Sequence, residues 1–389
     1  MRILVLVQSP VAGDARVERE ARTLAAAGHQ VTVVGRGVPV GYTLDDVTVL
    51  DAGRPAGLGS AASGRRQPGL VRVVRSAARW ALLPTHREKV ESAWRTAAAD
   101  VVRHLPADAV HAHDRNTLAL GAAEAARRGV PLVYDAHELW SDRGLPGRPT
   151  PLADRRRTRQ ETAHARTAAA VLTVSEGIAD VLRGRGLRDV RVVRNTFPAA
   201  PAGTPAGRPA TPVPSAPTGL LYAGRIGAHR DLESLVAAAD HLDGLSVTLV
   251  GPQDPHVAAA LRLPAGVEQH PAQPVDDLDD WYRARGIAAI TLTAGSRNHR
   301  LALPNKVFHA VRAGVPVVAA DLPELRRLVR THDLGELYTP GDPASLAAAA
   351  ARVRDRYANL TAAVRAARDE LSWERDARVL LDVYAELAR

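Results

Sequence analysis

Short apolar runs alternate with helix-like segments along this chain, and the whole alternation occurs twice. In the first half the runs are ILVLVQ, VTVVG, AVHAH, PLVYDAH and AVLTVS, separated by segments with helical spacing such as DARVEREARTLAAAG. The pattern restarts at TGLLYAGR and continues through LSVTLVG, AAITLTA and VPVVAAD. Continuous apolar strands that alternate with helices are typical of parallel sheets buried on both faces. The sequence therefore predicts an α/β chain with two doubly wound parallel-sheet domains.

A segment rich in Pro, Ala and Gly separates the two halves. It covers residues 197–219, FPAAPAGTPAGRPATPVPSAPTG, and cannot hold regular hydrogen-bonded structure. We therefore expect an N-terminal domain over residues 1–196, a linker over 197–219 and a C-terminal domain over 220–371. The tail, residues 372–389, predicts an amphipathic helix whose apolar face needs a partner, and we expect that partner to be the first domain.

Composition narrows the classes of function. The chain has no apolar run of about 18 residues, so we predict no membrane-spanning helix, and MRILVLVQSP is interpreted as a buried strand and not a signal peptide. Cysteine is absent, which excludes disulfides and thiolate chemistry and fits a cytoplasmic protein. The net charge of +9 favours anionic partners. Scattered basic residues and 4% aromatic residues disfavour nucleic acid and leave room for only weak peripheral membrane contact.

Basic residues follow two strands of the second half. Ligands of open parallel sheets bind beyond the carboxyl ends of the strands, so these positions are candidates for a site. Arg225 and Arg230 follow the strand at LLYA, and arginine binds phosphate through two parallel hydrogen bonds. In the sequence LPNK, Pro304 fixes a turn, Asn305 can cap the next helix, and Lys306 lies in the first helical turn. A cation there opposes the helix dipole unless an anion is bound, so we predict a diphosphate site.

Histidines and carboxylates gather after two strands of the first half. They are His111, His113, Asp114, Asp135, His137 and Glu138. Three interpretations are open: a metal site, histidines satisfied in the core, or hydrogen-bonding groups for a polar substrate. We favour the last, with His137 as the leading candidate because it lies at a strand tip, and we predict no metal. Near the first strand, Gly13 permits a tight turn at a helix start, and Arg16 either faces the ligand or lies on a solvated helix face.

Taken together, these segments resemble the retaining glycosyltransferases of family 4. The likeness includes GDARVEREARTLAAAGHQVTVV, VLTVSEGIADVL, YAGRIGAHRDLESLVAAA, LPNKVFHAVRAGVPVVAAD and SWERDARVLLDVY. The resemblance implies the GT-B fold, in which two Rossmann-like domains face each other across a cleft. It also implies transfer of a sugar from a nucleoside diphosphate sugar, UDP-sugar first, to an acceptor hydroxyl with retention of configuration. No cofactor or metal is implied, and the acceptor is a small molecule, a glycolipid or a polysaccharide.

The resemblance assigns roles to individual residues. Arg225 matches the phosphate-binding arginine, Arg230 stands where the family usually has a lysine for the same diphosphate, and His137 matches the histidine that contacts the donor sugar. Gly13 matches the glycine turn near donor and acceptor. We expect His137, Arg225, Arg230 and Lys306 to be catalytic. The expected donor-binding residues are Gly13, Arg225, Arg230, Gly251, His270, Asn305, Lys306 and His309, and the expected acceptor-binding residues are Arg16, Asp114 and Glu138.

The chain departs from the family at two positions. Many members carry glutamates, one near the donor sugar and one on the ribose hydroxyls, where this chain has Leu301 and His309. His309 can donate or accept one hydrogen bond to a ribose hydroxyl, but it lacks the two acceptor oxygens of a carboxylate. This departure permits two alternatives, a non-catalytic sugar-nucleotide binder and a partner subunit of another transferase. A third alternative is a sugar-nucleotide epimerase, and the missing glutamate counts against it. An inverting enzyme would need a base, with Asp114, His137 and Glu138 as candidates.

Overall fold

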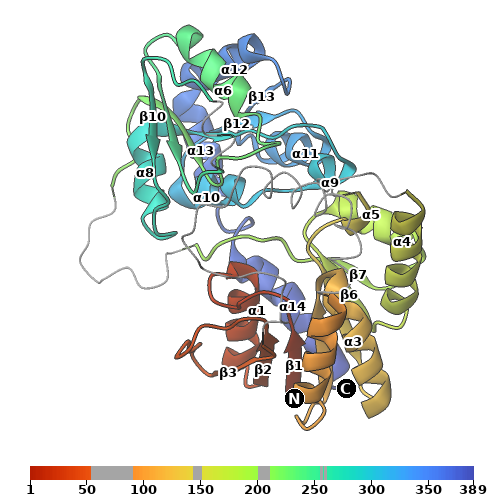
Figure 1. Ribbon diagram of the computed structural model, residues 1–389. Helices are drawn as coiled ribbons and strands as arrows, with labels where there is room; N and C mark the ends of the chain where they lie inside the picture. The colour runs from red at the N-terminus through yellow and green to blue at the C-terminus, as the bar shows by residue number, and fades with distance from the viewer. Residues whose placement is uncertain (54–90, 143–150, 200–210, 255–256, 258–260) are drawn as a thin grey trace, which may run out of the picture. The chain divides into compact units, whose positions relative to one another are not determined.

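The computed structural model describes the chain apart from residues 54–90, 143–150, 200–210, 255–256 and 258–260. The described residues form two compact units, and each is considered by itself. The first unit comprises Met1–Thr173, Ala179–Arg191 and Leu380–Arg389, and the second comprises Val174–Ile178 and Val192–Val379. Each unit is built on one parallel sheet (Figure 1).

The sheet of the first unit has the strand order β3-β2-β1-β4-β5-β6-β7. Its strands are β1 (Arg2–Leu6), β2 (Gln30–Gly35), β3 (Val47–Asp51), β4 (Ala109–His113), β5 (Leu132–Ala136), β6 (Ala170–Thr173) and β7 (Val190–Val192). The described helical segments between them include α1 (Ala15–Ala26), α3 (Asp114–Arg128), η1 (Trp140–Asp142), α4 (Pro151–Ala165) and α5 (Glu176–Gly184). The chain order reverses between β1 and β4, which is where doubly wound sheets bind their ligands.

Local sequence explains how α1 begins. Gly13 has φ +79°, a conformation that favours glycine. The carboxylate of Asp14 then accepts a hydrogen bond from the backbone N–H of Val17 and caps the helix. This turn places the start of α1 directly after β1, at the carboxyl edge of the sheet.

The sheet of the second unit repeats the same winding, with the order β10-β9-β8-β11-β12-β13. Its strands are β8 (Gly219–Ala223), β9 (Ser246–Val250), β10 (Val267–His270), β11 (Gly286–Ile290), β12 (Val317–Ala320) and β13 (Gly335–Tyr338). The described helical segments are α6 (Leu232–Ala238), η2 (Ala239–His241), α8 (Leu278–Arg285), α9 (Arg297–Leu301), α10 (Asn305–Ala313), α11 (Pro323–His332), α12 (Pro343–Asp355), α13 (Tyr357–Ala367) and α14 (Trp373–Leu387). The order reverses between β8 and β11, so the prediction of two doubly wound sheets is confirmed.

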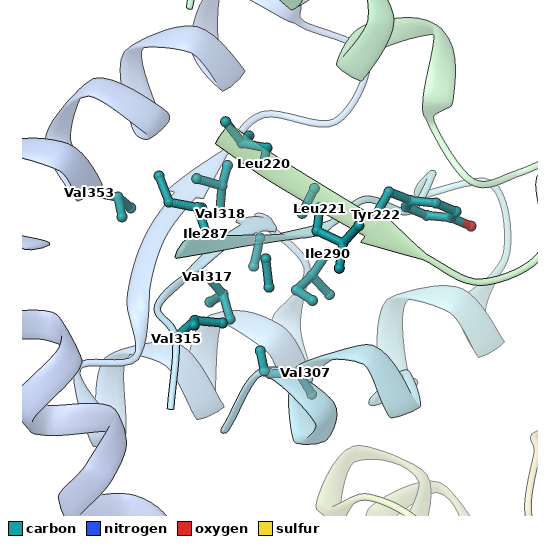
Figure 2. Packing of buried hydrophobic residues seen from close by; sticks show 14 of the residues in the cluster. Leu220, Leu221, Tyr222, Ile287, Ile290, Val307, Val315, Val317, Val318 and Val353 are labelled. Atoms are coloured by element: carbon teal, nitrogen blue, oxygen red, sulfur yellow. The ribbon is translucent and has the colours of Figure 1, made fainter. Parts of the chain in front are cut away.

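The core of the second unit explains why its central strands are so apolar. Figure 2 shows side chains from β8, β11, β12 and α10 packed together, including Leu220, Leu221, Tyr222, Ile287, Ile290, Val307, Val317 and Val318. All eight side chains are buried. The central strands therefore carry apolar residues on both faces, as the continuous apolar runs indicate.

The boundaries of the units differ in detail from the predicted ones. The second unit takes over the chain after Arg191, whereas the predicted domain boundary follows residue 196. Phe197, the first residue of the expected linker, packs in the core of the second unit. Residues 200–210 of that linker lie outside the described residues. The closing helix α14 is divided, because its residues from Leu380 onward belong to the first unit and the preceding ones to the second. In the parts of the chain that the structure describes, no helix is long and apolar enough to cross a bilayer.

Candidate active site

Lys306 lies against the carboxyl end of β8 in the second unit. Gly224 follows β8 with φ +148°, and a Cβ built there would lie 2.8 Å from Lys306 Cε and 3.2 Å from its Nζ. The ammonium group is 4.7 Å from the centroid of the Tyr222 ring, a cation–π contact. The structure thus brings Lys306 of α10 to the residue that directly precedes Arg225. Neither Gly224 nor Tyr222 is among the predicted site residues. The glycine directly before Arg225 is the sequence signal that could have indicated Gly224.

The electrostatics of this position favour an anion. Burial lowers the pKa of Lys306, and the nearby charge of Arg230 lowers it further, to about 7. Within the described residues, Lys306, Arg225 and Arg230 form no ion pair with a carboxylate. Arg225 is exposed and Arg230 partly buried. Three cations near one strand end, without a protein anion to balance them, suit a multiply charged ligand such as a diphosphate.

Two glycines directly follow the neighbouring strands β8 and β9. Gly251 follows β9 with φ +150°, and a Cβ built on it would lie 2.0 Å from the carbonyl oxygen of Gly224. The two strand ends can approach this closely only because Gly251 has no side chain. Gly251 therefore has a packing role that is visible in the structure, and its contact with the donor stays a prediction.

His270 lies farther from Lys306 within the sheet. It ends β10, which is two strands away from β8. Its ring packs on Trp281 at a centroid distance of 4.8 Å, and its Nε2 is 3.5 Å from Glu268 Oε2. The structure therefore separates His270 from Lys306 by a strand, and its role in donor binding stays a prediction.

The start of α10 differs from the predicted one. The helix begins at Asn305, and its N-cap is Pro304, which has no side-chain donor or acceptor. The prediction that Asn305 caps the helix is therefore wrong. Its side-chain oxygen instead accepts a hydrogen bond of 2.9 Å from Asn195 Nδ2. Asn305 is exposed, and its contact with the donor stays a prediction.

His309 packs inside the second unit. Its ring centroid is 3.8 Å from that of Phe197, and its Nδ1 lies 4.0 Å from Asp279 Oδ1. Burial alone would raise the pKa of Asp279, but the neighbouring His309 imidazole and the charge of Arg312 lower it. Arg312 Nε donates to Asp279 Oδ1 over 3.0 Å. The protein contacts of His309 are thus with an aromatic ring and a carboxylate, and its contact with a ribose stays a prediction.

In the first unit, strand register collects the predicted polar residues on one face. His113 of β4 pairs with Asp135 of β5 in the parallel ladder, so their side chains lie side by side. His111 lies two residues before His113, and side chains two apart share a face. Their rings stack at a centroid distance of 4.5 Å with 12° between their planes. The strand thus stays regular to its last residue, which is what brings these groups together.

Helix α1 covers this cluster with a buried ion pair. Arg16 is 3% exposed, so it does not lie on a solvated helix face. Its Nε is 2.8 Å from Asp135 Oδ2 and 3.0 Å from Glu20 Oε1. Burial raises the pKa of Glu20 despite the opposing charge of Arg16. The guanidinium of Arg16 already contacts two carboxylates. A contact between Arg16 and the acceptor substrate would be a third one, and it stays a prediction.

His137 lies at the exposed end of the same cluster. Its Nε2 donates to Asp135 Oδ2 over 2.8 Å, and its Nδ1 is 3.7 Å from Asp114 Oδ2. Burial alone would lower the pKa of His137, but the charges of Asp135 and Asp114 and the hydrogen bond to Asp135 raise it to about 9. The imidazole is therefore a cation at neutral pH.

The remaining predicted residues of the first unit lie at strand ends. Asp114 begins α3 with φ +63°, and its Oδ1 accepts a hydrogen bond of 3.0 Å from Trp140 Nε1. The backbone N–H of Gly13 donates to Glu18 Oε1 over 2.9 Å. Glu138 lies in the bend after β5 and is partly buried. Their roles toward donor or acceptor stay predictions.

The buried cluster also raises the question of a metal ion. Glu20, His111, His113 and Asp135 each offer a ligand atom, all within 4.8 Å of one another. However, the rings of His111 and His113 are inclined by only 12° to each other. The nitrogen lone pairs lie in the planes of these nearly parallel rings, so they do not point toward one common ion. The guanidinium of Arg16 also supplies the positive charge between the carboxylates. The arrangement fits an ion-pair network better than a metal site.

Comparisons with known proteins agree with this picture. A family model described as "Glycosyl transferase 4-like domain" matches residues 13–196, and one described as "Glycosyl transferases group 1" matches residues 217–356. A D-inositol 3-phosphate glycosyltransferase of Xylanimonas cellulosilytica is 28% identical over 315 residues, which is 72% of each chain. A glycogen synthase of Mycobacterium tuberculosis is 27% identical over 72% of this chain and 69% of its own.

Solved structures match over nearly the whole chain. Sucrose-phosphate synthase of Thermosynechococcus elongatus has a TM-score of 0.70 at 18% identity and covers 100% of this chain and 99% of its own. Anabaena HepE, in complex with UDP, has a TM-score of 0.68 at 17% identity and covers 99% of this chain and 100% of its own. The two doubly wound sheets, the order of the two family models and these structures lead to one conclusion: the chain belongs to the family 4-like glycosyltransferases with the GT-B fold and is an enzyme that transfers a sugar.

Proposed function

We propose that the enzyme transfers a hexosyl group from a nucleoside diphosphate sugar, UDP-sugar first, to an acceptor hydroxyl with retention of anomeric configuration. The observation that carries the proposal is the position of Lys306, which lies at the end of β8 near Arg230 without a carboxylate partner among the described residues. A bound diphosphate would supply the missing negative charge. The solved complexes of Anabaena HepE with UDP and UDP-glucose support this class of donor.

The proposed chemistry follows from where charge develops. As the glycosidic bond breaks, negative charge builds up on the leaving diphosphate, and Arg225, Arg230 and Lys306 would stabilise it. Cationic groups fixed in advance around a leaving group are usually the largest catalytic contribution. In a retaining reaction on one face of the sugar, a leaving phosphate oxygen can take the proton of the acceptor hydroxyl. The mechanism then needs neither a dedicated base nor a metal ion nor a cofactor.

The acceptor is the less constrained part of the proposal. Asp114 and Glu138 are the better candidates to bind its hydroxyls, since Arg16 is held by two carboxylates. A small natural product, a glycolipid and a polysaccharide are all compatible with this chemistry. The absence of cysteine fits a cytoplasmic setting, which we retain as part of the proposal.

Binding of nucleotides tests the proposal directly. A thermal-shift screen with UDP, GDP, ADP and dTDP identifies the base, and calorimetry then compares Arg225→Ala and Lys306→Ala with the wild type. We expect each variant to weaken binding several-fold or more. Arg330→Ala is a matched control, because Arg330 is an exposed arginine near the far end of α11. Unchanged affinity in both site variants would refute the assignment.

Product stereochemistry tests retention separately. Proton NMR of the glycosylated product distinguishes the two anomers through the coupling constant of the anomeric proton. We expect the anomer of the donor. The opposite anomer would contradict retention and would direct attention to Asp114 or Glu138 as a base.

A further inference from the structure

We propose that Asp135 and Arg16 are positioning residues that hold the His137 imidazole in one orientation and keep it protonated, so that His137 acts as a hydrogen-bond donor and not as a general base. The inference rests on the proposed transfer function and adds to it the state of one predicted catalytic side chain. It also gives a role to a buried polar cluster that a sugar-transfer reaction does not otherwise need.

Asp135 is the centre of the arrangement. Its side chain is 0% exposed, and polar atoms of Arg16, His113 and His137 all lie within hydrogen-bonding distance of it. Arg16 of α1 donates through Nε to Oδ2 and through Nη2 to Oδ1, each over 2.8 Å. His137 donates to Oδ2 over 2.8 Å, and His113 Nδ1 lies 3.1 Å from the same oxygen. The two-pronged contact with Arg16 prevents the carboxylate from rotating, so the acceptor for His137 is fixed in space.

The charges around His137 favour its cationic form. Asp135 precedes it by two residues and Asp114 faces it from the start of α3, while the charge of Arg16 on α1 opposes the cationic form. His113 of β4 also contacts it, with 2.9 Å between His113 Nδ1 and His137 Nε2. Burial raises the pKa of Asp135, but the charges of Arg16 and His137 lower it well below its usual range. The carboxylate is therefore ionised at neutral pH.

The second nitrogen of His137 is the one available for a ligand. Its Nδ1 is 3.7 Å from Asp114 Oδ2, which is beyond hydrogen-bonding distance. The side chain is 18% exposed, whereas those of Asp135 and His113 are 0% and 1% exposed. An imidazolium whose Nε2–H is held by Asp135 thus presents a single N–H at the strand end. That group can donate to a sugar hydroxyl or a phosphate oxygen, but it cannot accept a proton.

The remainder of the cluster fixes the positioning residues in turn. Glu20 Oε1 lies 3.0 Å from Arg16 Nε in an ion pair, and its Oε2 lies 3.6 Å from His111 Nε2. His111 Nδ1 is 2.8 Å from the hydroxyl of Tyr384, a buried residue of α14. Burial lowers the pKa of His111 well below its usual value, so this histidine is neutral. The buried part of the network therefore contains the ion pair of Arg16 with Asp135, and His137 lies at its exposed end.

Titration of His137 by NMR in the intact protein tests the proposal without relying on activity. Histidine-labelled protein is titrated from pH 5 to 10, and His137→Gln assigns the signal. In the wild type we expect His137 to titrate near pH 9. In Asp135→Asn the midpoint is expected to fall by roughly two pH units, because the neighbouring negative charge is lost. Asp180→Asn, which alters an exposed carboxylate of the same unit, should leave the midpoint unchanged.

Several outcomes would overturn the inference. A wild-type midpoint at or below 6.5 would do so even if Asp135→Asn failed to fold, and so would an unchanged midpoint in the folded variant. Stoichiometric zinc in the purified protein, lost in His111→Ala, would also overturn it, since an ion would replace Arg16 as the positive charge of the cluster.

The pH dependence of the reaction gives a second readout. With His137 as a charged donor, kcat/KM should decline on the alkaline side, and Asp135→Asn should move this decline about two pH units lower. At pH 8 the variant would then lose roughly an additional tenfold relative to pH 6. A rate that instead increases as His137 loses its proton would contradict the donor role. If no nucleotide binds at all, the transfer function fails, whereas the NMR midpoint still decides the state of His137.

Discussion

Binding of the donor should take up a proton at Lys306. The ammonium group has a pKa of about 7 in the free protein, below the ordinary lysine value of 10.5, because it is buried and lies near Arg230. A diphosphate beside it would restore the ordinary pKa, since opposite charge favours the protonated form. The bound state thus prefers the charged lysine at every pH between these two values.

The magnitude follows from this difference. The donor binds most tightly at pH values where Lys306 of the free protein is charged. Its affinity falls as the pH increases above 7. Between pH 6.5 and 8.5 the association constant should decrease about 25-fold, or about 1.9 kcal/mol. At pH 8 only about a tenth of the free lysine is charged, so binding should take up about 0.9 proton per site.

Calorimetry with UDP-glucose measures both quantities. Repeating the titration in buffers of different ionisation enthalpy gives the number of protons taken up, and the phosphates of UDP-glucose stay ionised throughout this range. Lys306→Met should bind more weakly and lose the pH dependence, while Lys306→Arg should also lose it, because arginine stays charged. A wild-type affinity independent of pH, or a dependence that survives in Lys306→Met, would refute the reasoning.

Three further substitutions test other contacts. His309→Glu should lower Tm, because a second buried carboxylate would stand where His309 Nδ1 now lies 4.0 Å from Asp279, at a cost of roughly 3 kcal/mol; a gain in stability would contradict this. Gly251→Ala should abolish folding or lower Tm strongly, since its Cβ would lie 2.0 Å from the Gly224 carbonyl oxygen, and an unchanged melting curve would argue against so close an approach. Lys306→Met should raise the Tm of the ligand-free protein by a few degrees at pH 6. That gain should shrink as pH increases from 7 toward 10.5, because the unfolded chain binds the lysine proton more tightly in this window.

The architecture could be predicted from the sequence because its signals are local. Continuous apolar runs indicate buried parallel strands, and both sheets have the expected winding. The proximity of Lys306 to the end of β8 could also be anticipated. Carboxyl ends of parallel strands share one edge of a sheet, and β8 and β11 are neighbours in it.

The environment of Arg16 could not be predicted, because it depends on a residue far along the chain. Arg16 and Glu20 are four residues apart on α1, a spacing that is also common for ion pairs on exposed helix faces. The buried partner of Arg16 is Asp135, which lies 119 positions later in the chain. A helix face alone does not disclose such a partner.

His309 illustrates the same difficulty in the second unit. The family resemblance places this position beside the ribose, but the side chain packs against Phe197 and near Asp279. Phe197 stands at the start of a segment whose composition indicates a linker, so nothing local predicts that it enters a core. The tertiary contacts, and not the spacing, decide what this histidine touches.

The multiple hydrogen bonds to Asp135 have an evolutionary consequence. A carboxylate shared by Arg16, His113 and His137 cannot be exchanged alone, because each donor would then face a partner of the wrong charge or length. Homologues should consequently conserve these four positions together or replace them together, and an alignment of diverged members should reveal that co-variation. If it does, the quartet would serve as a fingerprint for sorting unassigned members of this enzyme family into groups that share one mode of holding the histidine.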